Sequence, residues 1–213
     1  MQAITHTAVQ AVITGDIVNS TGLDRAKENQ LLKSLNRLFA SDKYEFYRGD
    51  SFQVFQQDAG GALRTALCCR AAAIGISTES STALSDVRIS IGIGRTKTPT
   101  TGLGTSKGEA FLLSGRAFDN IAKTSKRLAI TAAQPLANEA LKVIAAYADV
   151  LFQAMTPKQA EVIFELIGGA TQQDAAVKLG KSKSTINQHA SAGRWAEIEG
   201  LLGHYANIIK EIT

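Results

Sequence analysis

The feature that most constrains this chain is a change of pattern near residue 135. Before that point, short runs of β-branched and aromatic residues alternate with amphipathic stretches, and after it one helical pattern follows another. The first part predicts strands at residues 9–18, 44–47, 52–55, 87–93 and 127–131. Gly49 and Asp50 form a tight hairpin between the second and third of these. This order predicts a sheet with helices packed against it, followed by an all-helical part.

The helices between the strands begin at recognisable signals. Asp24 caps the first, which carries leucines at helical spacing, and Asp58 begins the second. A third is expected over residues 107–126, and a fourth begins near Pro135, because proline is favoured in the first turn of a helix. We therefore expect an α+β fold class, an α/β sandwich with a C-terminal all-α domain.

Composition places the chain among ordinary globular proteins. Apolar residues make up 45% and charged residues 20%, and no apolar run reaches the length of about 20 residues that a membrane span needs. The N-terminus lacks the pattern of a secretory signal, and the adjacent Cys68 and Cys69 cannot build a disulfide framework or a zinc site. We therefore expect a cytoplasmic protein with no membrane partner. A net charge of +4 permits nucleic-acid binding without requiring it.

The C-terminal part has the spacing of short helices separated by tight turns. Thr156, Thr171 and Ser182 are N-caps, and glycines at 168 and 180 end the first two helices. Two short helices joined by a glycine-containing turn, the second starting at a Ser or Thr cap, is the helix-turn-helix layout. The motifs Thr156-Pro-Lys-Gln-Ala and Thr171-Gln-Gln-Asp-Ala-Ala-Val-Lys-Leu-Gly-Lys-Ser-Lys-Ser-Thr-Ile-Asn-Gln-His189 resemble the helix-turn-helix of LuxR-type regulators and of sigma-factor region 4.

The last helix of this unit predicts a DNA-reading surface, with Ile186 as its buried anchor. Asn and Gln pair with adenine, Ser and Thr reach bases or phosphates, and Lys contacts the backbone. The candidate DNA-binding residues are Lys181, Lys183, Ser184, Thr185, Asn187, Gln188 and His189. The alternative is a helical hairpin that only packs or dimerises. It is favoured by charge, because residues 156–213 carry six basic and six acidic side chains.

Two aspartates in the N-terminal part suggest a metal site. Asp16 closes the first strand and Asp50 lies in the hairpin, so neighbouring strands would bring both to one end of the sheet. Two carboxylates there would share a Mg²⁺ or Mn²⁺ ion and leave positions for phosphate oxygens. Aspartates are also common at strand ends and in turns, so a turn-forming role stays open. The basic side chain of Arg48, beside the hairpin, is a candidate phosphate contact.

Four motifs follow one another in the order found in a known fold. They are Thr14-Gly-Asp-Ile-Val-Asn-Ser-Thr21, Tyr47-Arg-Gly-Asp-Ser-Phe-Gln-Val-Phe55, Val87-Arg-Ile-Ser-Ile-Gly-Ile-Gly94 and Gly108-Glu-Ala-Phe…Gly115-Arg-Ala-Phe118. The series resembles the ferredoxin-like fold of class III nucleotidyl cyclases, and above all their small relatives in the SatD family, which often join such a domain to a helix-turn-helix. The resemblance implies that Asp16 and Asp50 hold the metal, and that the backbone of Ile17, Val18, Asn19 and Ser20 binds phosphate.

The catalytic half of that resemblance is incomplete. Where cyclases that make cyclic AMP carry a lysine before the hairpin, this chain has Phe46, and where they carry an Asn and an Arg it has Asp119 and Lys123. Lys123 supplies charge to a nucleotide only as a point cation. Cyclisation depends on such positioned donors, so their loss would cost several kcal/mol of barrier. We therefore expect a domain that binds a ligand or nucleotide, or dimerises, without cyclising.

These observations together predict a cytoplasmic transcriptional regulator in three parts. Residues 1–133 form the cyclase-like domain, 134–155 a connecting helix and 156–213 the helix-turn-helix domain. A homodimer would present two recognition helices, as palindromic operators require. Two alternatives remain open: an active Mg²⁺- or Mn²⁺-dependent cyclase acting on ATP or GTP, and a protein-interaction module without DNA contact.

Overall fold

The computed structural model describes residues 9–47, 49–99 and 102–213. Its first part contains the strands and helices in the predicted order. The strands are β1 (Gln10–Val18), β2 (Lys43–Tyr47), β3 (Ser51–Gln56), β4 (Asp86–Gly94) and β5 (Leu128–Ala132). The helices among and after them are α1 (Arg25–Leu38), α2 (Ala62–Ile74), α3 (Glu109–Ala122) and α4 (Pro135–Gln153). The mixed α/β fold with a helical C-terminal part is therefore confirmed.

The five strands form one mixed sheet in the order β2-β3-β1-β4-β5. β3 runs antiparallel to both β1 and β2, so β1 and β2 are parallel to each other with β3 inserted between them. β4 is antiparallel to β1, whereas β5 is parallel to β4 and is reached through α3. This connectivity puts the end of β1 directly beside the β2–β3 hairpin.

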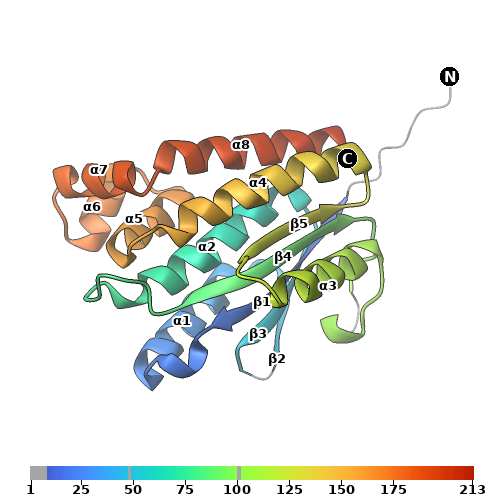
Figure 1. The fold of residues 1–213 in the computed structure, drawn as a ribbon, viewed down its shortest axis with the longest axis horizontal. Helices are drawn as coiled ribbons and strands as arrows, with labels where there is room; N and C mark the ends of the chain where they lie inside the picture. The colour runs from blue at the N-terminus through green and yellow to red at the C-terminus, as the bar shows by residue number, and fades with distance from the viewer. Residues whose placement is uncertain (1–8, 48, 100–101) are drawn as a thin grey trace.

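Helices cover both faces of the sheet (Figure 1). Alternation along β1 assigns the faces, because Ala11, Ile13 and Ile17 join the large core beneath α1, α2 and α4. Val12 faces the other way and joins a small cluster that includes Phe111 of α3. Asp16 is four residues after Val12, and every second residue of a strand points to the same face, so Asp16 lies on the α3 face of the sheet.

α3 lies unusually close to the sheet at one glycine. A Cβ atom added to Gly92 of β4 would overlap the backbone of Ala110 and Ser114. This close approach lets Ser114 reach the strands, where its hydroxyl lies 2.7 Å from Thr14 Oγ1 and its carbonyl accepts a 2.8 Å hydrogen bond from Ser90 Oγ. Thr14, Ser90 and Ser114 thus form a polar strip on this face of the sheet, and Asp16 follows Thr14 on the same face of β1.

The C-terminal helices form a further layer on the outside of α2 and α4. They are α5 (Pro157–Ile167), α6 (Gln172–Leu179), α7 (Lys183–Ala192) and α8 (Trp195–Glu211), and their starts match the predicted caps. α5 packs on α2, and α8 packs on α4. The Tyr205 hydroxyl of α8 donates a 2.8 Å hydrogen bond to Ala59 O, and Arg64 of α2 donates to Ile167 O. One hydrophobic cluster runs from the sheet to α8, while the predicted boundaries at 133 and 156 stay a prediction.

α2 is sandwiched between the sheet and α5, and 11 of its 13 residues are buried. This explains why its sequence is apolar almost all round. Cys68 and Cys69 are both buried as free thiols, as their place in an apolar stripe predicts. Burial raises the pKa of the Cys68 thiol to about 12.

A buried arginine ties α2 to its neighbours. Arg70, fully buried, donates two hydrogen bonds to Asp86 at 3.1 and 2.7 Å and a third to Asp149 of α4 at 2.9 Å. Its guanidinium lies 5.1 Å from the ring centroid of Phe152. Asp149 also accepts a 3.0 Å hydrogen bond from the backbone N–H of Arg127. These contacts connect α2, β4, α4 and the start of β5. Within the described ranges, no helix is long and apolar enough to cross a membrane.

Candidate functional site

The structure brings Asp16 and Asp50 to the same end of the sheet. Asp16 pairs in register with Ser51 of β3, and the N–H of the following residue, Ile17, donates a 3.0 Å hydrogen bond to Asp50 O. The two carboxylates are close enough for the charge of Asp50 to act on the pKa of Asp16. Strand pairing therefore gives the pair of carboxylates its place.

Asp16 is partly desolvated and only half paired. Its Oδ2 accepts a 3.1 Å hydrogen bond from Arg88, while its Oδ1 is buried and has no hydrogen-bond partner among the described residues. Burial raises the pKa of Asp16 above its ordinary value, Arg88 opposes that rise and the Asp50 charge adds to it. A cation at the free oxygen would relieve both the burial cost and the repulsion.

Asp50 is held by the turn that follows β1. Asn19 has a left-handed backbone conformation, with φ of 59°, and directs the chain into a short 3₁₀ turn at Ser20–Gly22. Ser20 Oγ then donates a 3.2 Å hydrogen bond to Asp50 Oδ2. The predicted phosphate-binding backbone is thus beside Asp50, but the N–H of Ile17 is already bonded to Asp50 O and its side chain is buried in the core. Val18, Asn19 and Ser20 remain the candidates of that turn.

The residues at this end of the sheet fit a weakly held divalent ion. In the part of the chain that the structure describes, no group of three or more His, Cys, Asp or Glu residues could hold a metal by itself. Two carboxylates, one with an unpartnered buried oxygen, match the hard oxygen ligands of Mg²⁺ or Mn²⁺. Such an ion would need further oxygens from water or from a phosphate ligand.

Two basic residues of this site were missed by the sequence analysis. Arg88 is ion-paired with Asp16, and the charge of Arg127 also lowers the pKa of Asp16. Strand alternation could have found Arg88, because β4 pairs with β1 and places Arg88 directly opposite Asp16. Lys123 is exposed at the end of α3, and Arg48 falls outside the described residues.

Phe46, where the resemblance expects a lysine, belongs to an aromatic cluster. Its ring centroid lies 6.1 Å from that of Phe39 and 5.8 Å from that of Phe52. The side chain is half-buried in this packing and offers no hydrogen-bonding group to a purine base. The departure from the cyclase pattern is therefore built into the packing of β2 and β3.

The second candidate site is the α6–α7 pair. Gly180 ends α6 in the left-handed conformation, with φ of 61°, and Ser182 caps α7 through a 3.1 Å hydrogen bond from the N–H of Thr185. Ile186 and Ala190 of α7 are buried against the neighbouring helices. The predicted residues whose side chains are exposed are Lys183, Ser184, Asn187 and Gln188.

The other three predicted DNA contacts are partly used inside the protein. Lys181 makes a 2.5 Å salt bridge with Glu161 of α5, and the Thr185 hydroxyl lies 2.8 Å from Ser182 Oγ. His189 is half-buried. A further lysine beside the turn, Lys178, pairs with Glu165 at 2.8 Å. These pairs neutralise two of the three lysines around the turn.

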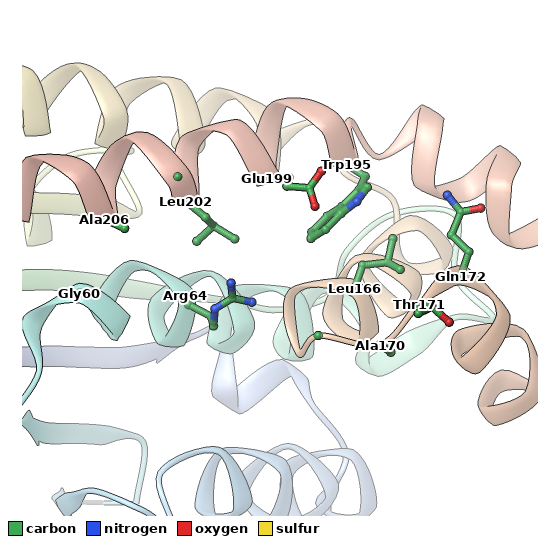
Figure 2. A pocket seen from close by; sticks show the side chains of 12 residues that line it. Gly60, Arg64, Leu166, Ala170, Thr171, Gln172, Trp195, Glu199, Leu202 and Ala206 are labelled. Carbon is green, nitrogen blue, oxygen red and sulfur yellow. The ribbon is translucent and has the colours of Figure 1, made fainter.

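A cavity of about 580 Å³ separates the start of α2 from the C-terminal helices (Figure 2). Figure 2 shows Arg64 on one wall and Glu199, Trp195 and Leu202 of α8 on the other, with Thr171 and Gln172 at one end. Its size suits a small molecule, and its lining is part apolar, part polar. No local pattern predicted it, because its walls range from Gly60 to Ala206.

Comparison with known proteins gives a faint likeness only. No protein-family model matches the chain, and no curated protein does. Two solved structures described as a bacterial light-regulated adenylyl cyclase align at 17% and 16% identity, each with a TM-score of 0.41. Each alignment covers 58% of this chain, and the two cover 43% and 76% of the solved chains. The chain thus spans less than half the length of the first.

Proposed function

We propose that this protein is a cytoplasmic DNA-binding regulator of transcription. The observation that carries the proposal is the division of α7 into two faces. Ile186 and Ala190 anchor one face in the core, and the side turned away from it exposes Ser184, Asn187 and Gln188 beyond a short helix and a glycine turn. A short polar helix anchored in this way is the form in which helix-turn-helix proteins enter the major groove.

Each exposed group has a distinct role in this proposal. Asn187 and Gln188 read base edges, since their amides pair with adenine N6 and N7. Lys183 and Ser184, in the first turn of α7, contact a phosphate together with the N-terminus of the helix. Thr185 and His189 lie at the margins of this face. Lys181 contributes little charge while it is paired with Glu161.

Fluorescence anisotropy with labelled duplex tests the proposal. The wild-type chain should bind a pool of random duplex at about 50 mM salt, with a shallow salt dependence because few lysines are free. The double variant Asn187→Ala/Gln188→Ala should weaken binding to a selected sequence at least about tenfold, each lost base contact costing about 1–3 kcal/mol. Asn207→Ala, an exposed asparagine of α8, is the control. Equal effects of the two variants would sink the DNA-reading role of α7.

For the N-terminal part, we propose a class III cyclase-like domain that binds a nucleotide without cyclising it. Asp16 Oδ1 and Asp50 would hold one Mg²⁺ or Mn²⁺, with Arg88 orienting Asp16 and Ser20 orienting Asp50. When bound, the ion supplies positive charge to the phosphates. The aromatic packing of Phe46 supports the absence of turnover, because no base-recognising donor occupies that position.

The active-cyclase alternative is favoured by the meeting of Asp16 and Asp50. Incubation of the pure protein with ATP or GTP and Mn²⁺ separates the two. We expect no cyclic product and retained nucleotide binding; cyclic product that disappears in Asp50→Ala would establish the enzyme instead.

The interaction-module alternative is favoured by the lysines paired with Glu161 and Glu165. It predicts no binding to any duplex at about 50 mM salt, where non-specific electrostatic contacts are strong. The regulator that we propose acts as a homodimer, which would bring two copies of α7 to one DNA.

A further inference from the structure

The outer face of α4 is apolar. The structure records seven exposed large hydrophobic side chains in the described residues, and four of them are on this one helix. Leu136 is 79% exposed, Val143 69%, Val150 65% and Tyr147 44%. No other described element covers these side chains, and α4 itself runs beside β5 in Figure 1. A concentrated apolar face of this kind marks an interaction surface.

The spacing of these residues is that of a helix–helix seam. Leu136, Ala140, Val143, Tyr147 and Val150 follow one another at alternating steps of four and three, all of them exposed. That repeat is the narrow a/d stripe by which one helix packs against another, not the broader stripe that faces a globular core. The core-facing stripe of α4 is separate and includes Leu141, Ala148 and Phe152.

The seam is free of charge along its length. Glu139 and Lys142 are the exposed charged residues of α4, and they pair with each other at 2.6 Å. Asp149 is buried in the Arg70 network on the inner side. A solvated face of a surface helix normally carries charges opposite its core stripe. Their absence from the seam indicates that it is covered in the working protein.

We propose that the seam, formed by Leu136, Ala140, Val143, Tyr147 and Val150 of α4, binds the same seam of a second copy across a two-fold axis through Val143. In an antiparallel pair, Val143 meets the partner's Val143, and Leu136 meets the partner's Val150. Ala140 lies three residues before this centre and Tyr147 four after it, so each tyrosine lies within one residue, about 1.5 Å along the helix, of the partner's small alanine. This self-matching of large and small residues about one centre is what an isologous interface requires.

The surface beside the seam is hollowed, with a lining that is part apolar and part polar and includes Lys126 and Lys142. Val150 also lines a groove of about 480 Å³ between α3 and α4, whose floor is the edge strand β5. The groove adds Ala146, Ile121 and Ala129 to the surface that a partner would cover. Side chains from α3 and β5 would therefore be buried in the dimer together with those of α4, because a stable interface usually buries more surface than one helix provides.

The dimer has a consequence for DNA reading, which rests on the proposed function. α4 has 19 residues and so is about 28 Å long, and α5–α7 follow its C-terminal end. In an antiparallel pair the two copies of α7 lie at opposite ends of the joined helices, farther apart than that length. The expected target is therefore a pair of half-sites separated by one helical turn of about 34–36 Å or by a multiple of it.

Sedimentation of the full chain without DNA tests the seam separately from DNA binding. The wild-type protein should have twice the mass of one chain across the micromolar range. Val143→Glu puts two carboxylates opposite each other at the axis and should weaken dimerisation at least about 100-fold. Val177→Glu, an equally exposed valine of α6, is the matched control and should leave the dimer unchanged. A wild-type monomer, or equal sedimentation of both variants, would overturn the proposal.

Two further measurements fix the partner and its direction. A mixture of Val143→Glu with Val143→Lys should recover the dimer as a heterodimer, because the charges now attract. Under mild oxidation, Val143→Cys should cross-link to itself, whereas Leu136→Cys should cross-link only when mixed with Val150→Cys. The native thiols of Cys68 and Cys69 are buried and do not compete. Self-cross-linking of Leu136→Cys would overturn the antiparallel arrangement.

Discussion

The acidic end of the sheet and the α6–α7 pair are built from opposite kinds of contact. Ser20 reaches Asp50 across 30 residues of sequence, and Asp16 depends on the pairing of β1 with β3 and β4. In the helix pair, Thr171 and Ser182 each cap a backbone N–H only three residues ahead. The first site exists only when the whole sheet is assembled, while the second is specified locally.

The two regions also treat charge differently. Asp16 keeps a buried oxygen without a partner, whereas Lys178 and Lys181 of the helix pair are satisfied by glutamates of α5. A partly desolvated carboxylate with one oxygen left without a partner favours a ligand, whereas fully paired charges favour stability and attract other charges weakly. The difference teaches that the acidic site has the charge that suits an ion, while in its proposed role α7 would contact DNA mainly through uncharged groups.

The variant with the largest expected loss of stability tests how far the sheet and the helices on it depend on contacts between residues distant in sequence. Arg70→Met removes a buried cation from two carboxylates and should lower the free energy of unfolding by about 3–5 kcal/mol. Urea unfolding measures it, with Arg25→Met on the exposed face of α1 as control. A loss no larger than that of the control would mean that Asp86 and Asp149 find other partners.

Replacement of a glycine in the sheet should give the next largest loss of stability. Gly92→Ala places a Cβ against the backbone of α3, and the helix must move away from β4. Overpacking of this kind should cost about 1–3 kcal/mol. Gly115→Ala, with open space around its Cβ position, is the matched control within α3 itself. If thermal unfolding gives similar midpoints for both, the close approach of α3 is not maintained in solution.

Loss of one cap should have a smaller effect. Thr171→Ala and Ser182→Ala each remove a hydroxyl from a helix N-terminus and should each cost about 1 kcal/mol. Because the two caps serve different helices, urea unfolding of the double variant should give nearly the sum. A much larger loss would show that the helix pair also depends on contacts with the rest of the molecule.

Metal should have the smallest effect. Two carboxylates without a third protein ligand bind an ion weakly, so millimolar Mn²⁺ should stabilise the wild-type chain by less than about 1 kcal/mol. The shift should vanish in Asp16→Asn and persist in Asp174→Asn, a surface aspartate of α6. Thermal unfolding with and without the ion measures both. Equal shifts of the unfolding temperature in the two variants would show that the ion does not bind at the acidic end of the sheet.

What the sequence predicted follows the same division between local and distant contacts. Thr156, Thr171 and Ser182 were recognised as caps from their neighbours alone, and each begins a helix of the structure. The places of Asp16 and Asp50 needed only the assumption that their strands are neighbours. Arg88 needed the actual β1–β4 register.

The Arg70 network and the cavity could not be predicted. In the sequence, Arg70 looks like any charged residue of a helix, because its partners Asp86 of β4 and Asp149 of α4 are distant along the chain. The cavity needs the packing of α8 against α2, which no periodicity specifies. Long-range packing thus set the limit of prediction.

Trp195, on the wall of that cavity, is the only tryptophan of the chain. Its indole is half-buried between the two halves of the protein, beside Glu199 and facing Arg64 across the gap (Figure 2). The molecule therefore contains a built-in optical probe at the junction of its sheet and its helical layer. A change in emission colour would report any occupant or separation there without a label.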